Sequence, residues 1–143
     1  MDDRVLAGMG WFRIAVQALV VVAETDRACS SSAIAQELKV HATFLRRVMA
    51  LLVRANIVSA HEGRDGGYRL ARPATSITLA EIYLAAKAAC PVDGSEARKI
   101  GSPRVQHLLD GVTEEIQQAM LATLSRYTIA SLIESPLPTI SRS

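Results

Sequence analysis

The spacing of apolar and polar residues changes several times along this chain of 143 residues, and each change marks a different element. Residues 10–25 are apolar with few interruptions; the β-branched run Val20–Val22 would suit a strand, but the length favours a buried helix. Residues 33–38 follow three serines that can cap a helix, and Lys39–Val40 is the expected turn. A second helix is expected from about His41 to Ala55, where apolar residues keep to one face. The pattern therefore predicts a helix–turn–helix.

Two short segments after this helix predict a β-hairpin. We expect strands at residues 57–61 and 68–72, joined by a glycine-rich tip at residues 63–67 in which Asp65-Gly66 is the turn signal. Asn56 can end the preceding helix, because asparagine tolerates the left-handed conformation. A helix–turn–helix followed by a hairpin is the winged-helix arrangement, which places a helix in the major groove of DNA.

The C-terminal half is also predicted to be helical. Thr78 and Glu81 form a capping box that opens one helix. After a break rich in glycine, proline and charge, Ser102-Pro103 is a typical helix start, with serine as the cap and proline at the first position. Only Gly111 disfavours a helix over the next ~32 residues, which predicts a helix about 50 Å long.

Such a helix is longer than a domain of this size can cover with its own core. Its apolar stripe could pack inside the domain, but we favour pairing with a second copy of the chain. The predicted interface residues are Leu109, Val112, Ile116, Met120, Leu124 and Tyr127.

The expected fold class is mainly α with a small β-hairpin (α+β). We expect a winged helix–turn–helix domain at residues 1–90, a sensor or linker loop at 91–102, a dimerisation helix at 103–135 and a mobile tail at 136–143. A chain of this length suits one such domain with its dimerisation element.

Charge is unevenly distributed along the chain. The whole chain carries a net charge of +2, but residues 39–72 hold seven basic and two acidic residues, a net charge of +5, which leaves −3 for the remainder. A local basic patch on a nearly neutral protein suits a phosphate backbone better than a membrane surface.

The second predicted helix carries residues suited to the major groove. His41, Ala42 and Thr43 are small or able to form hydrogen bonds, so the backbone can approach the bases. Of Arg46 and Arg47, one could bind guanine and the other a phosphate, although both could also lie on a solvated face.

Further contacts with DNA are expected from the first helix of the helix–turn–helix and from the β-hairpin, which is called the wing. Ser31 and Ser32 can hold a phosphate, cap their helix, or do both. Gly66 and Gly67 would allow a close approach to the sugar–phosphate wall, and Arg64 would enter the minor groove, unless the tip is only a tight turn. The candidate DNA-binding residues are Ser31, Ser32, His41, Ala42, Thr43, Arg46, Arg47, Arg64, Asp65, Gly66, Gly67 and Tyr68.

Four segments resemble the IscR/BadM regulators, also called the Rrf-two family: SSAIAQEL, FLRRVMALLVRANIV, GRDGGYRLARP and ITLAEIYLA. Their order and spacing match over roughly residues 10–90, and the wing is the most specific of them. The resemblance implies a homodimeric transcription factor, usually a repressor, that binds a palindromic operator. Asn56 stands where the family usually has glycine.

The cysteines differ from those of the iron–sulfur members of this family, which place three cysteines in the loop between the last two helices. That loop and its edge contain only Cys90, so we expect no cluster and no metal. The motif at Cys90 is similar to that of a cluster-free subgroup, which leaves two alternatives: a redox-sensing thiol or a packed cysteine. Cys29 is expected to be structural, and His41, His61 and His107 lack metal-ligand spacing.

Other functions fit less well. No paired carboxylates, nucleophile–base pair or phosphate loop indicates an enzyme. Asp2 and Asp3 do not suit a signal peptide, so we expect a cytoplasmic protein. The alternatives are a winged-helix module that binds protein, or a regulator that holds an iron–sulfur cluster with non-standard ligands. The basic exposed face argues against the first of these.

Overall fold

The computed structural model describes residues 9–89 and 100–135. In chain order the elements are α2 (Gly10–Ala23), α3 (Ser31–Leu38), α4 (Ala42–Arg54), β1 (Val58–His61), β2 (Gly67–Leu70), the short 3-10 helix η1 (Ala74–Ser76), α5 (Leu79–Ala86), a second 3-10 helix η2 (Lys87–Ala89), α6 (Pro103–Leu124) and α7 (Ile129–Glu134). Within this part of the chain, no helix is both long enough and apolar enough to cross a membrane.

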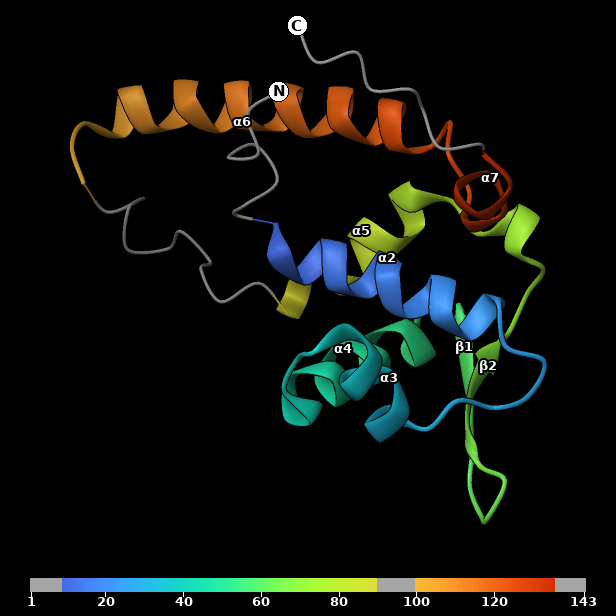
Figure 1. Cartoon of the computed structure of the whole chain (residues 1–143). Coiled ribbons are helices and arrows are strands. Elements are labelled where there is room, and N and C mark those ends of the chain that lie inside the picture. Colours follow the sequence, from blue (N-terminus) through green and yellow to red (C-terminus); the bar gives the residue numbers. More distant parts are fainter. Residues whose placement is uncertain (1–8, 90–99, 136–143) are drawn as a thin grey trace, which may run out of the picture.

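The first apolar segment is a helix, as its length predicted, and not a strand. Trp11, Ala15, Leu19 and Val22 of α2 are all buried. They form one core with residues of α3, α4 and α5 and with Ile129 of α7. Helix α2 lies in the middle of the body, with α3 and α4 on one side and α5 on the other (Figure 1).

The helix–turn–helix forms at the predicted place, with slightly different bounds. The hydroxyl oxygen of Ser30 accepts a hydrogen bond from the N–H of Ala33 at 3.1 Å, so α3 begins at Ser31, two residues earlier than predicted. Lys39 ends α3 in the left-handed conformation, with a φ of 58°. Asn56, with a φ of 60°, follows α4 in the same way, as its residue type predicted.

The hairpin pairs Val58 with Leu70 and His61 with Gly67 in an antiparallel register. At its tip the N–H of Gly66 donates to the carbonyl oxygen of Gly63 at 3.0 Å. The turn is therefore centred on Arg64 and Asp65, and the prediction of an Asp65-Gly66 turn was wrong by one residue.

A third segment joins the wing. The N–H of Cys29 donates to the carbonyl oxygen of Tyr68 at 3.0 Å, and the N–H of Tyr68 donates to the carbonyl oxygen of Cys29 at 2.7 Å. The wing is thereby joined to the connection between α2 and α3. This pairing could not be predicted from the sequence, because only one residue takes part on each side.

The single long helix predicted for residues 103–135 is wrong: α6 ends at Leu124, and α7 is a separate helix. The side chain of Thr128 caps α7 by accepting a hydrogen bond from the N–H of Ser131. The carbonyl oxygen of Tyr127 accepts the N–H of Leu79, and the N–H of Ile129 donates to Ile77. These bonds and the full burial of Ile129 stabilise the break. Tyr127 thus lies outside α6.

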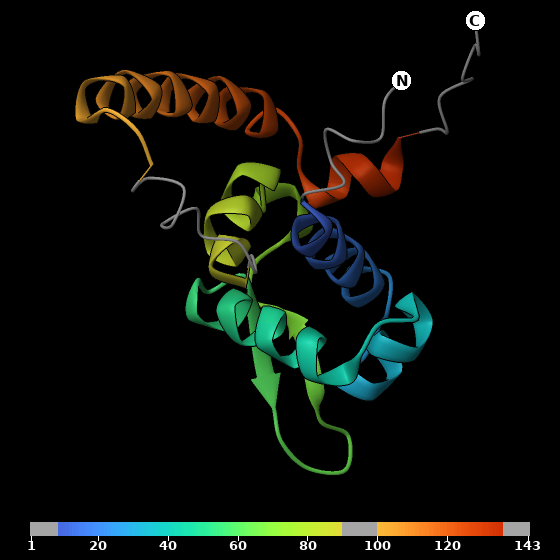
Figure 2. The ribbon, with the colours of Figure 1, turned by 90° about the vertical axis from the view of Figure 1, so that its left-hand side faces the viewer.

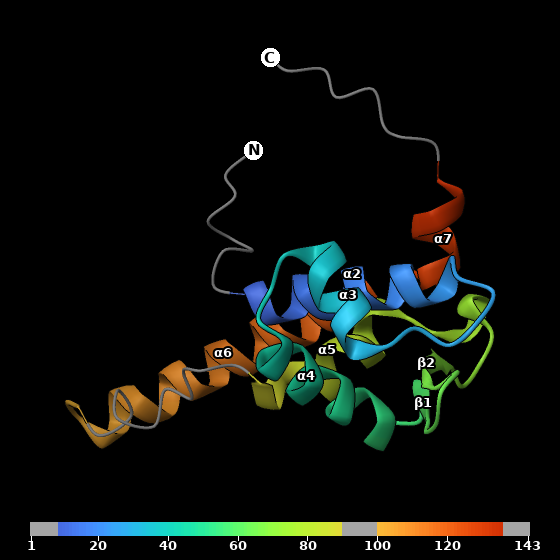
Figure 3. The same cartoon turned by 60° about the horizontal axis from the view of Figure 1, so that its bottom comes forward.

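The helix–turn–helix and the wing lie on the opposite side of the molecule from the long helix α6. In Figure 1 the wing projects from the lower side, beside α3 and α4, whereas α6 runs along the upper side. Figure 2 gives the same arrangement after a quarter turn. Figure 3 brings α3, α4 and the wing towards the viewer. Helix α6 packs on the body mainly through α5.

Candidate nucleic-acid interface

Helix α4 presents its basic residues to solvent because its apolar residues face the core. Leu45, Val48, Met49 and Leu52 are completely buried. The intervening side chains at the N-terminal end of the helix are exposed: His41, Thr43, Arg46 and Arg47, with Ala42 half-buried. The predicted major-groove residues are therefore together at one accessible end of α4.

The two arginines of α4 have different surroundings. Arg46 is exposed and makes no hydrogen bond or ion pair within the described parts of the chain. The guanidinium group of Arg47 donates to the carbonyl oxygen of Ala88 in η2 at 3.3 Å. Arg46 is therefore free to contact DNA, whereas Arg47 joins α4 to the end of η2.

The N-terminus of α3 lies beside the wing. Since Ser30 is the capping residue, Ser31 and Ser32 occupy the first two helical positions. The alternative in which these two serines serve as the cap is therefore wrong. A shallow groove separates Ser31 from His61 and Tyr68 of the wing.

Close contacts within the protein explain why the wing has glycine at positions 66 and 67. Gly67 has a φ of +138°, and a Cβ atom there would overlap with the carbonyl group of Cys29. A Cβ atom on Gly66 would overlap with the carbonyl oxygen of His61. Both positions require glycine for the wing to form, whether or not DNA is bound. Arg64 and Asp65 lie between Gly63 and Gly66, in the turn, and both are exposed.

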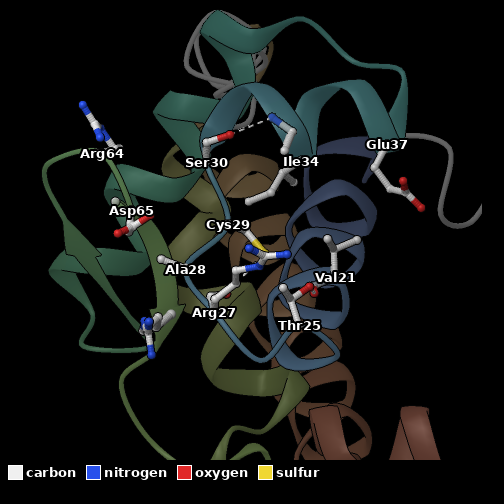
Figure 4. A pocket seen from close by; sticks show the side chains of 13 residues that line it. Val21, Thr25, Arg27, Ala28, Cys29, Ser30, Ile34, Glu37, Arg64 and Asp65 are labelled. Carbon is white, nitrogen blue, oxygen red and sulfur yellow. Dashed lines mark hydrogen bonds between the residues drawn. The ribbon is translucent and has the colours of Figure 1, made fainter.

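A second groove lies between the wing, the end of α2 and α3 (Figure 4). Arg27, Arg64 and Asp65 are among the residues that line it. Cys29 also lines it but is buried, and its sulfur lies 3.9 Å from the carbonyl oxygen of Arg27. Burial and the backbone pairing with Tyr68 agree with a structural cysteine.

Arg72 makes contacts that the sequence did not predict. Its guanidinium group donates to the carbonyl oxygens of Asn56 and Ser76 and forms an ion pair with Glu81 at 3.0 Å. Partial burial raises the pKa of Glu81, but hydrogen bonds from Thr78 and the charge of Arg72 outweigh it and lower the pKa below its ordinary value. The capping box was visible in the sequence, whereas the partner nine residues away was not.

The predicted dimer residues divide into two groups. Leu109, Val112 and Ile116 are at least half exposed, as an interface stripe requires. Met120 is half-buried, and Leu124 packs partly against the chain's own core. Cys90 lies outside the described residues. Within the described residues, no three histidine, cysteine or acidic side chains form a group that could hold a metal ion.

Residues 11–135 match the family described as "Rrf2: Iron-dependent Transcriptional regulator". The chain belongs to the Rrf2 family. Rrf2 proteins are DNA-binding transcriptional regulators of the helix–turn–helix type, and not enzymes. The predicted family and the prediction that the chain is no enzyme are therefore confirmed.

Individual relatives agree with this assignment. A Neisseria meningitidis protein named as an HTH-type transcriptional regulator, NMA1593, is 30% identical over 129 residues, or 85% of this chain and 84% of the relative. BadM of Rhodopseudomonas palustris, named in the same way, is 29% identical over 81% of this chain and 73% of its own. The match to YwgB of Bacillus subtilis is 28% identical and spans 66% of this chain but only 57% of that relative.

Solved structures of Rrf2 regulators share the fold. IscR of T. potens superposes with a TM-score of 0.66 at 21% identity, covering 92% of this chain and 90% of that one. CymR, named as the global cysteine regulator of B. subtilis, gives a TM-score of 0.61 at 22% identity, covering 85% and 91%. The predicted fold class, a mainly α winged helix–turn–helix with a small hairpin, is thereby confirmed.

Proposed function

We propose that this Rrf2 protein is a homodimeric repressor that binds a palindromic operator in the cytoplasm. The observation that carries the proposal is that α4 and the wing lie on one side of the molecule, opposite α6 (Figure 1), with the N-terminal end of α4 and the wing tip exposed. Arg46 would contact a base edge in the major groove and Arg64 the minor groove. Ser31 and Ser32 would hold a phosphate at the start of α3.

The proposed partner of α6 is a second copy of the chain. Val105, Leu108, Leu109, Val112 and Ile116 are all at least half exposed on this one helix, and an apolar stripe of that kind marks a protein interface. One copy reads half of a palindromic site, so a two-fold pairing through α6 would match the symmetry of the DNA.

Fluorescence anisotropy with labelled DNA tests the proposal. The probe is the duplex of about 30 base pairs that the wild-type protein selects from a random library, which spans two half-sites. Arg46→Ala and Arg64→Ala should each weaken binding about five- to hundredfold. Arg104→Ala, which removes the same charge from exposed α6, should have little effect. Equal affinities for all four proteins would show that the proposed contact surface is wrong.

A redox response through Cys90 is a second element of the proposal. It is supported by the hydrogen bond from Arg47 to Ala88, which joins helix α4 to a residue that is two positions before Cys90 in the sequence. Mild peroxide should weaken DNA binding by the wild type and by Cys29→Ser, but not by Cys90→Ser. An identical response of all three would remove Cys90 from the mechanism.

We propose no resident cofactor. The family description mentions iron, but Cys90 is the only cysteine between α5 and α6, too few for the usual thiolate ligands. An ultraviolet–visible spectrum of anaerobically purified protein tests this, because an iron–sulfur cluster absorbs visible light. Cluster absorption would favour the alternative of non-standard ligands, and binding to protein but not to DNA would favour an interaction module.

A further inference from the structure

Arg72 lies at the base of the wing, two residues after the end of β2 at Leu70. Its Nε donates to the carbonyl oxygen of Asn56 at 3.2 Å, its Nη1 to Ser76 at 3.4 Å, and its Nη2 to Oε1 of Glu81 at 3.0 Å. One side chain therefore links Asn56 between α4 and β1, the 3-10 helix η1 after β2, and helix α5. All five guanidinium hydrogens point from one rigid plane, so these three bonds restrict the angle at which the wing leaves the body.

Glu81 holds the other side of this link. While Oε1 binds Arg72, Oε2 accepts the N–H of Thr78 at 3.0 Å and its hydroxyl group at 3.3 Å. The same carboxylate thus caps α5 and pairs with Arg72. On either side of Thr78, Ile77 and Leu79 form backbone hydrogen bonds with Ile129 and Tyr127. A continuous set of bonds therefore runs from the wing to the corner between α6 and α7.

Because both side chains are partly exposed, we expect the link between Arg72 and Glu81 to affect the direction of the wing more than the stability of the fold. The side chains of Arg72 and Glu81 are 29% and 40% exposed, and ion pairs open to water contribute little to the free energy of unfolding. The wing is already held to the body near its middle by Cys29 and Tyr68. A second attachment at the base fixes its direction, since one point alone would let it pivot.

We propose that Arg72 and Glu81 are positioning residues that orient the wing, so that Arg64 reaches the minor groove while α4 occupies the major groove. The inference rests on the proposed DNA-binding function. Neither residue contacts DNA in this proposal. Arg64 is in the turn that the bond between Gly66 and Gly63 closes at the tip of the hairpin. The hairpin projects from the body, so a small rotation at its base displaces the tip by a larger distance (Figure 1).

Glu81→Gln isolates the positioning role. Glutamine is also a capping-box residue, so its oxygen can still accept the N–H of Thr78 and start α5. Its amide group would then face the guanidinium group of Arg72, donor against donor, and the ion pair is lost. Removal of a negative charge by itself strengthens DNA binding. Positioning predicts the opposite sign, so the two effects cannot be confused.

The experiment measures the affinity of the selected duplex for wild type, Glu81→Gln, Arg64→Ala, Arg46→Ala and the two double variants with Glu81→Gln. Glu24→Gln removes the same charge from the exposed end of α2 and reports the effect of charge alone. We expect Glu81→Gln to weaken binding about fivefold. That loss should disappear in the Arg64→Ala background, where the tip contact is already absent, and persist in the Arg46→Ala background. The midpoint of thermal unfolding should change little.

Three results would overturn the inference. Glu81→Gln could bind DNA as tightly as Glu24→Gln does. The loss of DNA affinity caused by Glu81→Gln could be just as large in the Arg64→Ala background. That loss could also come with a large drop in the midpoint of thermal unfolding, both in the wild-type and in the Arg64→Ala background. In each case wild-type binding remains, so the proposed function stands. Wild-type protein that selects no duplex would overturn the proposed function, and with it the positioning role.

Discussion

Gly67 is the residue on which the wing depends most directly, because its backbone conformation and its surroundings both exclude a side chain. The sequence suggested that DNA required this glycine, whereas the carbonyl group of Cys29 supplies a reason within the protein. We expect Gly67→Ala to lower the free energy of unfolding by about 2 kcal/mol or more, from left-handed strain and the clash together. Urea denaturation measures this.

Gly111 provides the matched control. It lies in the interior of α6, and a Cβ atom there would meet nothing within 4 Å. Gly111→Ala should raise the free energy of unfolding by up to about 1 kcal/mol, because alanine is the better helix former. Equal effects at the two glycines would show that Cys29 does not restrict Gly67.

Glu81 gives the stability a defined pH dependence. Its pKa is lowered from 4.5 in the folded chain, so its ion pair and cap contribute stability above that pH. The contribution is lost as the pH falls through the lowered folded-state value. The difference in stability between wild type and Glu81→Gln is expected to be small at pH 7, because the ion pair is partly exposed, and in urea titrations down to about pH 3 it should shrink further towards acid. A constant difference would mean that Glu81 does not titrate as described.

At the scale of the elements, the boundary between α6 and α7 shows where local sequence is insufficient. Residues 125–128 contain no glycine or proline, and the cap at Thr128 lacks the glutamate or glutamine that makes a capping box recognisable. The break is stabilised by backbone bonds to residues 77–79, which are distant in the sequence. The helix–turn–helix and hairpin could be predicted because their signals are local.

Thr128→Ala tests the break. Loss of the side-chain cap should lower the free energy of unfolding by about 1 kcal/mol, measured by urea denaturation. Thr113→Ala removes a hydroxyl group that bonds only within α6, to the carbonyl oxygen of Leu109. This control should be neutral or slightly stabilising. A loss at Thr113 as large as that at Thr128 would contradict the assigned cap.

Helix α4 carries two arginines, Arg46 and Arg47, whose contributions to DNA binding can be measured separately. A phosphate contact contributes about one unit to the slope of log affinity against log salt, whereas a bond inside the protein contributes none. Because Arg47 donates to Ala88, we expect Arg47→Ala to weaken binding without changing the slope. Arg46→Lys keeps the charge and serves as the reference for an unaltered slope. A decrease of about one unit for Arg47→Ala would instead make Arg47 a phosphate contact.

At the scale of the whole molecule, the sequence indicated both surfaces but not their relation. Basic residues predicted the DNA-binding side and the apolar stripe predicted α6, yet their positions on opposite sides follow only from the packing of α2, α4 and α5 (Figure 2). This arrangement would leave α6 accessible while the wing and α4 bind DNA. Pairing through α6 would therefore present two reading surfaces to one duplex.

Charges placed within the stripe test that pairing. Val112 and Ile116 are 50% and 63% exposed, so Val112→Glu and Ile116→Glu should leave each chain folded, as circular dichroism would show. Sedimentation equilibrium should then give the 15.4 kDa mass of one chain instead of twice that mass. Affinity for the palindromic duplex should fall about a hundredfold or more, because the second half-site no longer adds to the first. Gln118→Glu introduces the same charge at an exposed polar position of α6 and should remain dimeric. Dimers that persist in both stripe variants would exclude α6 as the interface.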